Sequence, residues 1–313
     1  MKVPPMIDLI PAPFDLGASR RGAADGPRAL LDAGLEAKLA QLHLPYRLQA
    51  ACTPAAGTPR TAEGSEEAPA PSAGGRPAMR HLAAAIAWNE ALAARVAASV
   101  ADGGWPLVLG GDHSIAIGTI AGLAERYRRL GVLWIDAHSD LNTDLTTPSG
   151  NIHGMSLAAG LGLGSKSLTS IGGQTGKIRP ERVAIVGARS LDPEEKRLIR
   201  ALGVNCYTMH DIDRRGIANV MEEALRIISA DADGVHVSFD IDSLDPREAP
   251  GTGTPVGGGL SDREAFLAME MIAEAGVATS AEFVEVNPDA DPLGRTAELA
   301  VELIGSLLGE RIL

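Results

Sequence analysis

The chain has 313 residues, of which 45% are hydrophobic and only 3% aromatic, so a folded core must consist mainly of aliphatic side chains. The formal net charge of −12 argues against nucleic acid or an anionic membrane as a partner, and no stretch approaches the ~18 continuous apolar residues of a membrane span. The only cysteines, Cys52 and Cys206, do not make a disulfide framework, so we expect a cytoplasmic protein.

Short apolar, β-prone runs alternate with longer helical patterns along the chain. The runs predict strands at 6–10, 47–51, 107–109, 132–136, 183–186, 204–207, 235–240 and 281–286. The helical patterns lie at 27–41, 79–100, 115–130, 193–201, 220–229, 262–274 and 297–308. This alternation predicts an α/β fold with three αβα layers, in which an eight-stranded parallel sheet is covered by helices on both faces.

The segment 53–78 departs from this alternation. It is built largely of Pro, Gly and Ala and contains no Val, Ile, Leu or aromatic residue, so it cannot bury enough apolar surface to order itself. We predict a mobile surface loop within a single domain that spans 1–313. A linker between two domains is the weaker alternative, because about fifty preceding residues are too few for an independent α/β domain.

Metal-type side chains occupy alternating positions in two segments that follow predicted strands. The first segment holds Asp136, His138 and Asp140, and the second holds Asp240 and Asp242. In an extended chain, such alternating residues project to the same side. Charged groups next to a buried strand are costly unless something compensates them. The two segments together therefore indicate a shared metal site.

A third segment, Gly110 and Gly111 followed by Asp112 and His113, comes after another predicted strand. Alone it is explained equally well by a turn whose histidine bonds to the backbone. With the other segments, it completes a set of four carboxylates and two imidazoles, which would balance two divalent cations. Such oxygen-rich sites with one imidazole per metal favour Mn²⁺ over Zn²⁺, and Mg²⁺ is a weaker candidate.

A pair of metal ions lowers the pKa of a shared water and supplies hydroxide at neutral pH, so hydrolysis is the expected class of reaction. The competing interpretation is that the aspartates only cap helices and stabilise turns. That interpretation accounts easily for one segment but poorly for three of them together.

Longer motifs around these residues resemble the ureohydrolases, the family of arginases and agmatinases. The resemblance lies in 110–114, 136–142, 149–155 and 238–246, and extends to 15–27 and 282–288. It implies an eight-stranded parallel sheet, two Mn²⁺ ions, and attack of a bridging hydroxide on a guanidinium carbon to release urea. It also implies that one ion is held by His113 and Asp140, the other by His138 and Asp242, with Asp136 and Asp240 bridging and Asp140 orienting the hydroxide.

The resemblance is to arginases in particular at the residues expected to bind the substrate's amino-acid end. By this resemblance, Asn142, Ser149 and Asn151 bind an α-carboxylate, and Asp192 and Glu195 address an α-ammonium. The chemistry agrees, because neutral donors suit a carboxylate and acids suit an ammonium. The simpler alternatives are an ordinary turn at Ser149 and a helix N-cap at Asp192, and Asp192 could serve both roles.

Three further residues take roles by the same resemblance. His153 is similar to a proton-shuttle histidine that protonates the leaving amine, although a purely structural histidine is the alternative. Glu285 matches a glutamate that binds the guanidinium, as a carboxylate can through two parallel hydrogen bonds. Thr254 matches a residue near the guanidinium.

The expected reaction is hydrolysis of L-arginine, a small-molecule substrate, to L-ornithine and urea. Three alternatives stay open: a ureohydrolase acting on agmatine or another guanidino compound, a manganese or zinc amide hydrolase of similar fold, and a catalytically silent relative. The substrate-binding set argues against the amide hydrolase, and the intact ligand set argues against the silent relative. The resemblance also implies a homo-oligomer, either a trimer or a hexamer.

Overall fold

The computed structural model describes residues 6–54 and 77–312. Within them, eight strands form one sheet in the order β2-β1-β3-β8-β7-β4-β5-β6, and every neighbouring pair is parallel. The strands are β1 (Ile7–Ala12), β2 (Tyr46–Leu48), β3 (Trp105–Gly110), β4 (Leu130–Ile135), β5 (Val183–Ala188), β6 (Asn205–Thr208), β7 (Gly234–Asp240) and β8 (Ser280–Val284). The predicted parallel sheet is therefore confirmed.

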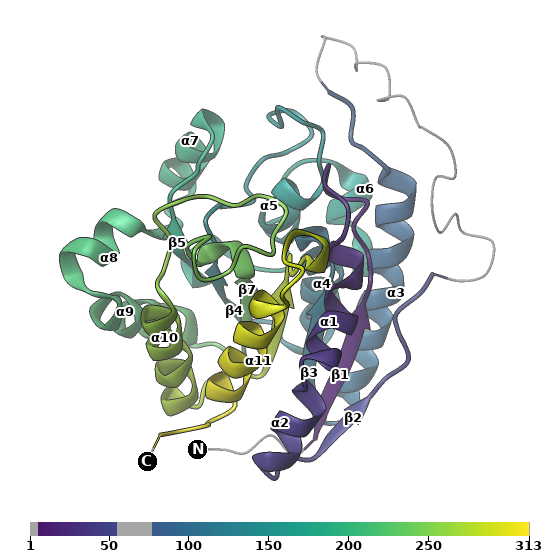
Figure 1. Ribbon diagram of the computed structural model, residues 1–313. Coiled ribbons are helices and arrows are strands. Elements are labelled where there is room, and N and C mark those ends of the chain that lie inside the picture. The colour runs from purple at the N-terminus through teal and green to yellow at the C-terminus, as the bar shows by residue number, and fades with distance from the viewer. Residues whose placement is uncertain (1–5, 55–76, 313) are drawn as a thin grey trace.

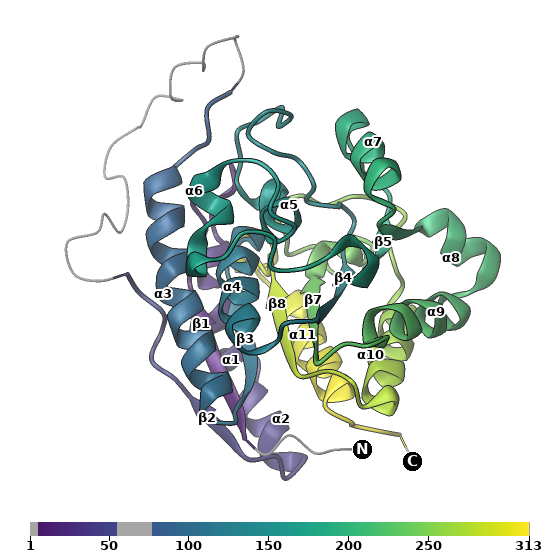
Figure 2. The ribbon, with the colours of Figure 1, turned by 180° about the vertical axis from the view of Figure 1, so that it is seen from behind.

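Helices cover both faces of this sheet (Figures 1 and 2). They are α1 (Gly26–Asp32), α2 (Leu35–Gln41), α3 (Leu82–Ala101), α4 (Ala116–Arg126), α5 (Ser156–Gly160), α6 (Lys166–Thr169), α7 (Pro193–Leu202), α8 (Met209–Arg215), α9 (Ile217–Ser229), α10 (Asp262–Ala275) and α11 (Arg295–Leu307). In β4, Leu133 and Ile135 pack into a core shared with α1, α2, α9, α10 and α11, whereas Val132 and Trp134 pack into a second core shared with α3, α4 and α5. Both faces of the sheet are thus apolar, as the three-layer prediction requires.

The predicted helix over 27–41 is wrong as a single element. The structure divides it into α1 and α2, and Gly34 lies between them with a φ of 97°. That left-handed conformation is accessible to glycine but interrupts a right-handed helix. The apolar periodicity continued across the break because both short helices bury leucines against the same face of the sheet.

The helices α5, α6 and α8 were not predicted. Helix α8 begins with a capping box. Thr208 Oγ1 accepts a hydrogen bond from the N–H of Asp211, and the Asp211 carboxylate accepts one from the N–H of Thr208. Threonine followed by an acid three residues later is a recognisable signal for a helix start. It is weak here because the helix covers only seven residues.

The predicted loop over 53–78 lies mostly outside the described residues, which exclude 55–76. That the chain forms one domain over 1–313 therefore stays a prediction. Among the helices of the described residues, none combines the length and the apolar character needed to cross a bilayer.

Candidate metal centre and substrate pocket

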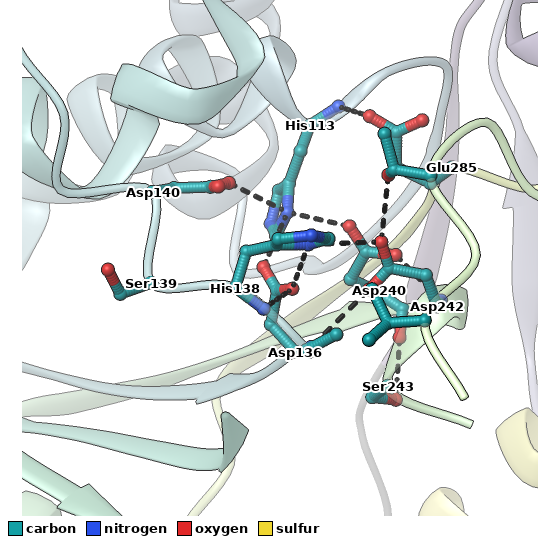
Figure 3. A network of polar contacts seen from close by, with 12 residues as sticks. His113, Asp136, His138, Ser139, Asp140, Asp240, Asp242, Ser243 and Glu285 are labelled. Carbon is teal, nitrogen blue, oxygen red and sulfur yellow. Dashed lines mark hydrogen bonds and ion pairs between the residues drawn. The ribbon is translucent and has the colours of Figure 1, made fainter. Parts of the chain in front are cut away.

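The six predicted metal ligands come together at one edge of the sheet (Figure 3). Strands β3, β8, β7 and β4 are neighbours in the middle of the sheet, and all are parallel. Their carboxyl ends therefore meet at the same edge, where ligands of open α/β sheets bind. His113 follows β3, Asp136 follows β4, and Asp240 ends β7.

One group of ligands surrounds His113, which is 1% exposed. Its Nδ1 atom lies 3.2 Å from Asp136 Oδ2, 3.2 Å from Asp140 Oδ2 and 3.0 Å from Asp240 Oδ2. Despite these short distances, Nδ1 has no hydrogen-bond partner of acceptable geometry among the described residues. A buried nitrogen that faces three carboxylate oxygens and lacks such a bond is suited to bind a cation.

A second group forms around His138, on the open side of the first. Its Nδ1 atom lies 3.4 Å from Asp136 Oδ1 and 3.2 Å from Asp242 Oδ2. Asp136 thus presents one oxygen to each histidine, as expected of a carboxylate shared by two metal ions. Thr254 Oγ1 donates a hydrogen bond of 2.9 Å to the same Oδ2 of Asp242, so it orients this carboxylate from the pocket side.

Beneath His113, a buried relay determines which ring nitrogen faces the carboxylates. Its Nε2 atom lies 2.8 Å from Ser238 Oγ, and Ser238 Oγ donates a bond of 2.7 Å to Glu282 Oε1. Because the hydroxyl proton is directed to Glu282, Ser238 accepts from Nε2–H of His113. The imidazole also stacks on the Trp134 ring, with centroids 4.1 Å apart. Serine and tryptophan together direct Nδ1 toward the aspartates.

The charges of the cluster are unbalanced without a cation. Burial raises the pKa of Asp140 and of Asp240, and the charge on neighbouring aspartates raises both further, well above the usual range. Burial lowers the pKa of His113, but contact with the surrounding carboxylates outweighs burial and raises it well above its usual value. Both directions mean that this point of the molecule attracts positive charge. The donor set, with imidazole and carboxylate but no thiolate, therefore fits hard or borderline divalent metal ions.

The buried Glu285 and the partly buried His153 form a pair next to the predicted metal ligands. Glu285 Oε1 accepts a bond of 2.8 Å from the backbone N–H of His113 and lies 3.1 Å from His153 Nδ1. Burial lowers the pKa of His153, but the hydrogen bond and charge of Glu285 raise it to about 9. His153 is therefore predominantly protonated at neutral pH in the metal-free protein.

Asp112, which was not predicted as a site residue, lies close enough to this pair for their charges to affect its pKa. Its Oδ2 atom accepts a bond of 3.0 Å from the N–H of Ala18, and its Oδ1 atom accepts one from the N–H of Ser114. Burial and the charge on Glu285 raise the pKa of Asp112 to about 6. Its place in the glycine-rich 110–114 motif was the available signal, but the motif alone did not indicate a bond to the N-terminal segment.

A polar cavity of about 150 Å³ opens above the metal ligands. Of the predicted residues, those that line it are His138, Asp140, Asn142, Ser149, Asn151, His153, Asp192, Glu195, Asp240 and Thr254. His113, Asp136 and Asp242 lie buried beneath it. Ser190 also lines the cavity and was missed. Its position just after β5, at the same edge of the sheet, was the signal that could have found it.

The residues predicted to bind an α-carboxylate and an α-ammonium all line this cavity. Asn142 Nδ2 donates to Asp192 Oδ2 at 2.8 Å, which joins the two groups directly. Ser149 Oγ accepts from the N–H of Asn151 at 3.2 Å, and Asn151 Oδ1 accepts from Ser19 Oγ at 2.9 Å. The simple interpretations of a turn at Ser149 and a helix N-cap at Asp192 are both seen, and neither prevents contact with a ligand in the cavity.

Comparisons with known proteins agree with this geometry. A family model described as the arginase family matches residues 6–309. The arginase of Bacillus caldovelox is 52% identical over 98% of this chain and 99% of its own length, and its structure superposes with a TM-score of 0.90. An arginase of Entamoeba histolytica in complex with L-ornithine is 32% identical, with a TM-score of 0.85 over 97% and 98% of the two chains. A hypothetical agmatinase of Burkholderia thailandensis is 26% identical, with a TM-score of 0.73 over 96% and 84%.

Proposed function

Because the chain belongs to the arginase family, we propose that it is an arginase, which hydrolyses L-arginine to L-ornithine and urea. The observation that carries the proposal is the cluster of four aspartates and two histidines at the base of a polar cavity. The similarity to arginases at up to 52% identity, against 26% to the agmatinase, supports arginine over agmatine as the substrate.

The proposed cofactors are two Mn²⁺ ions. Each ion would be bound by one histidine, and two carboxylates would be shared. His113 and Asp140 would bind one ion, and His138 and Asp242 the other. Asp136 and Asp240 would bind both. When bound, two such ions lower the pKa of a water molecule so that hydroxide is available at neutral pH. The contact of Asp136 with both histidines supports this division.

The guanidinium group of the substrate would be oriented by Glu285. Its Oε1 atom is occupied by His113 N and His153 Nδ1, whereas no hydrogen bond to Oε2 is found among the described residues. A buried carboxylate, 1% exposed, that keeps one oxygen available is suited to a cationic guanidinium. Thr254 lies at the cavity wall and can contribute a polar contact on the same side.

The amino-acid end of arginine would be recognised by other residues that line the cavity. Asn142, Ser149 and Asn151 offer amide and hydroxyl donors to an α-carboxylate, and Asp192 offers a carboxylate to the α-ammonium. Loss of urea leaves an amine that needs a proton. His153 lines the cavity and can donate that proton, and its contact with Glu285 favours the protonated ring.

Release of urea in the presence of Mn²⁺, measured with L-arginine and with agmatine, tests the proposal. We expect urea from L-arginine and far less from agmatine, since agmatine lacks the carboxylate that three of the wall residues would bind. Urea from agmatine alone would establish an agmatinase instead. Two bound metals without urea from any guanidino compound would contradict hydrolysis of this substrate class altogether.

We further propose a cytoplasmic homo-oligomer, either a trimer or a hexamer. Both cysteines are free thiols, which suits a reducing compartment. The oligomeric state rests on family resemblance, and sedimentation of the purified protein tests it. A monomer at micromolar concentration would contradict it.

A further inference from the structure

Glu195 is a buried carboxylate at the start of α7 whose two oxygens are both occupied by protein groups. Its Oε2 atom accepts a bond of 2.8 Å from the N–H of Asp192, which closes the capping box of the helix. Its Oε1 atom accepts from Ser139 Oγ at 2.8 Å and from the N–H of Leu141 at 3.1 Å. A capping box needs only the first of these contacts, so the other two require a separate explanation.

The two additional donors are the immediate neighbours of Asp140, one of the candidate metal ligands. Asp140 has a φ of 49°, in the left-handed region that residues other than glycine adopt at a cost. A strained residue persists only when its surroundings hold it in place. Glu195 holds Ser139 and Leu141 with a single oxygen atom, and the N–H of Ala158 bonds to the Asp140 carbonyl at 3.1 Å.

The other oxygen of Glu195 connects this loop to the substrate wall. It binds the backbone of Asp192, whose side chain accepts from Asn142 at 2.8 Å. One carboxylate thus joins the loop that carries metal ligands to the helix end that carries the candidate ammonium-binding group. With 4% exposure and three donors already bound, little capacity is left for a ligand.

We propose that Glu195 is a positioning residue, which keeps Asp140 and Asp192 in the geometry that metal and substrate require, and that it does not bind the α-ammonium itself. This inference rests on the proposed arginase function. It revises the sequence-based expectation for Glu195 and leaves Asp192 as the acid that faces the ammonium.

Affinity for Mn²⁺ in the metal-depleted protein, measured by competition with a chelating dye, tests the link to Asp140. In Glu195→Gln, the NH₂ group of the amide must face either the Asp192 N–H or the Leu141 N–H. Both of these groups are hydrogen-bond donors, so one hydrogen bond is replaced by a repulsive contact between two donors. We expect about tenfold weaker Mn²⁺ binding, the lower end of what loss of a supporting contact costs a metal site. Unchanged affinity would overturn the proposal.

Glu194→Gln is the matched control. It removes the same charge from the same turn of α7, but Glu194 pairs with Arg197 and, among the described residues, makes no hydrogen bond to Ser139 or Leu141. We expect its Mn²⁺ affinity to equal that of the unmodified protein, and an equal loss in both variants would mean that net charge is responsible. Ser139→Ala removes one of the three donors and keeps Glu195, so it tests the same link if Glu195→Gln does not fold. A smaller weakening is expected there, and none would contradict the proposal.

A substrate without the ammonium separates positioning from direct contact. 5-Guanidinopentanoic acid is arginine lacking its α-amino group. If Glu195 positions the site, Glu195→Gln lowers urea release from both compounds through Asp140, and lowers it further for L-arginine, whose ammonium also needs Asp192. A loss confined to L-arginine, with normal Mn²⁺ affinity, would show direct binding of the ammonium. If the unmodified protein released urea from neither compound, the proposed function would fail, while the metal measurement would still decide the role of Glu195.

Discussion

Asp136 is the carboxylate of the candidate metal site that faces both histidines. It is fully buried, and its two oxygens face His113 and His138 separately, at 3.2 and 3.4 Å. No other carboxylate of the cluster contacts both histidines. The shared position explains why a residue at a strand end is kept charged although burial disfavours charge.

We therefore expect Asp136→Asn to lose both metal ions together. An amide offers one neutral oxygen and one NH₂ group, so at least one ion would face a group that cannot bind it, and the site loses one negative charge. Metal content by plasma mass spectrometry should fall below one ion per chain, with urea release at background. Asp213→Asn, an exposed change on α8, serves as the control. Retention of two ions by the Asp136 variant would exclude the bridging assignment.

At the scale of elements, the register between β7 and β8 brings together the residues that orient His113. Ser238 lies opposite Glu282, and His236 lies opposite Ser280. Glu282 is fully buried, and the Nε2 atom of His236 lies 3.3 Å from its Oε1 atom. Burial raises the pKa of Glu282, but the charge on His236 and the neighbouring contacts outweigh it and lower the pKa overall. The carboxylate therefore stays ionised and acts as the acceptor at the end of the relay.

Ser238→Ala should weaken metal binding about tenfold or more, because the imidazole of His113 loses the contact that orients it. Ser280→Ala removes only the contact of 3.0 Å to His236 Nδ1, which is farther from His113. It should therefore weaken metal binding less than Ser238→Ala does. Competition with a chelating dye measures both. Equal affinities in the two variants would show that the relay does not support the metal site.

The edge strand β2 is held to β1 by an ion pair between the exposed Arg47 and the buried Asp8. Arg47 donates two bonds to Asp8, at 2.8 and 3.0 Å, and Ser99 donates a third. Burial raises the pKa of Asp8, but these contacts outweigh burial and lower the pKa below its usual value. A lowered folded-state pKa stabilises the folded state above the unfolded-state value of about 3.9, and the stabilisation is lost as the pH falls through the folded-state value.

Arg47→Gln should consequently lower the free energy of unfolding at pH 7, and the difference from the unmodified protein should narrow as the pH falls toward 3. Urea denaturation followed by circular dichroism across this range measures the effect. A difference that is constant with pH would mean that the charge of Asp8 is not involved.

At the scale of the whole molecule, local patterns predicted much of the fold and the site. Strands β4 and β7 could be predicted because each apolar run lies next in sequence to the polar residues at its end. The relay and the contacts of Glu195 could not be predicted. Ser238 meets Glu282 only because β8 lies next to β7, and Glu195 meets Ser139 only through the packing of α7 on the loop after β4. Strand order and helix packing are not encoded in spacing along the chain.

Insertion of β8, the last strand of the chain, between β3 and β7 is the feature that completes the site. It places Glu285 beside His113, 172 residues away in sequence. The prediction of one helix over 27–41 was wrong for a related reason. A periodic pattern indicates which face of a helix is buried, but it does not indicate that the backbone turns at Gly34.

The central claim is that distant strand ends converge to hold two metal ions. A crystal of the protein grown with Mn²⁺, with diffraction data collected at the manganese absorption edge, tests it most directly. We expect two anomalous peaks per chain, both in contact with Asp136, one beside His113 and the other beside His138. A single peak, or peaks away from these histidines, would contradict the account.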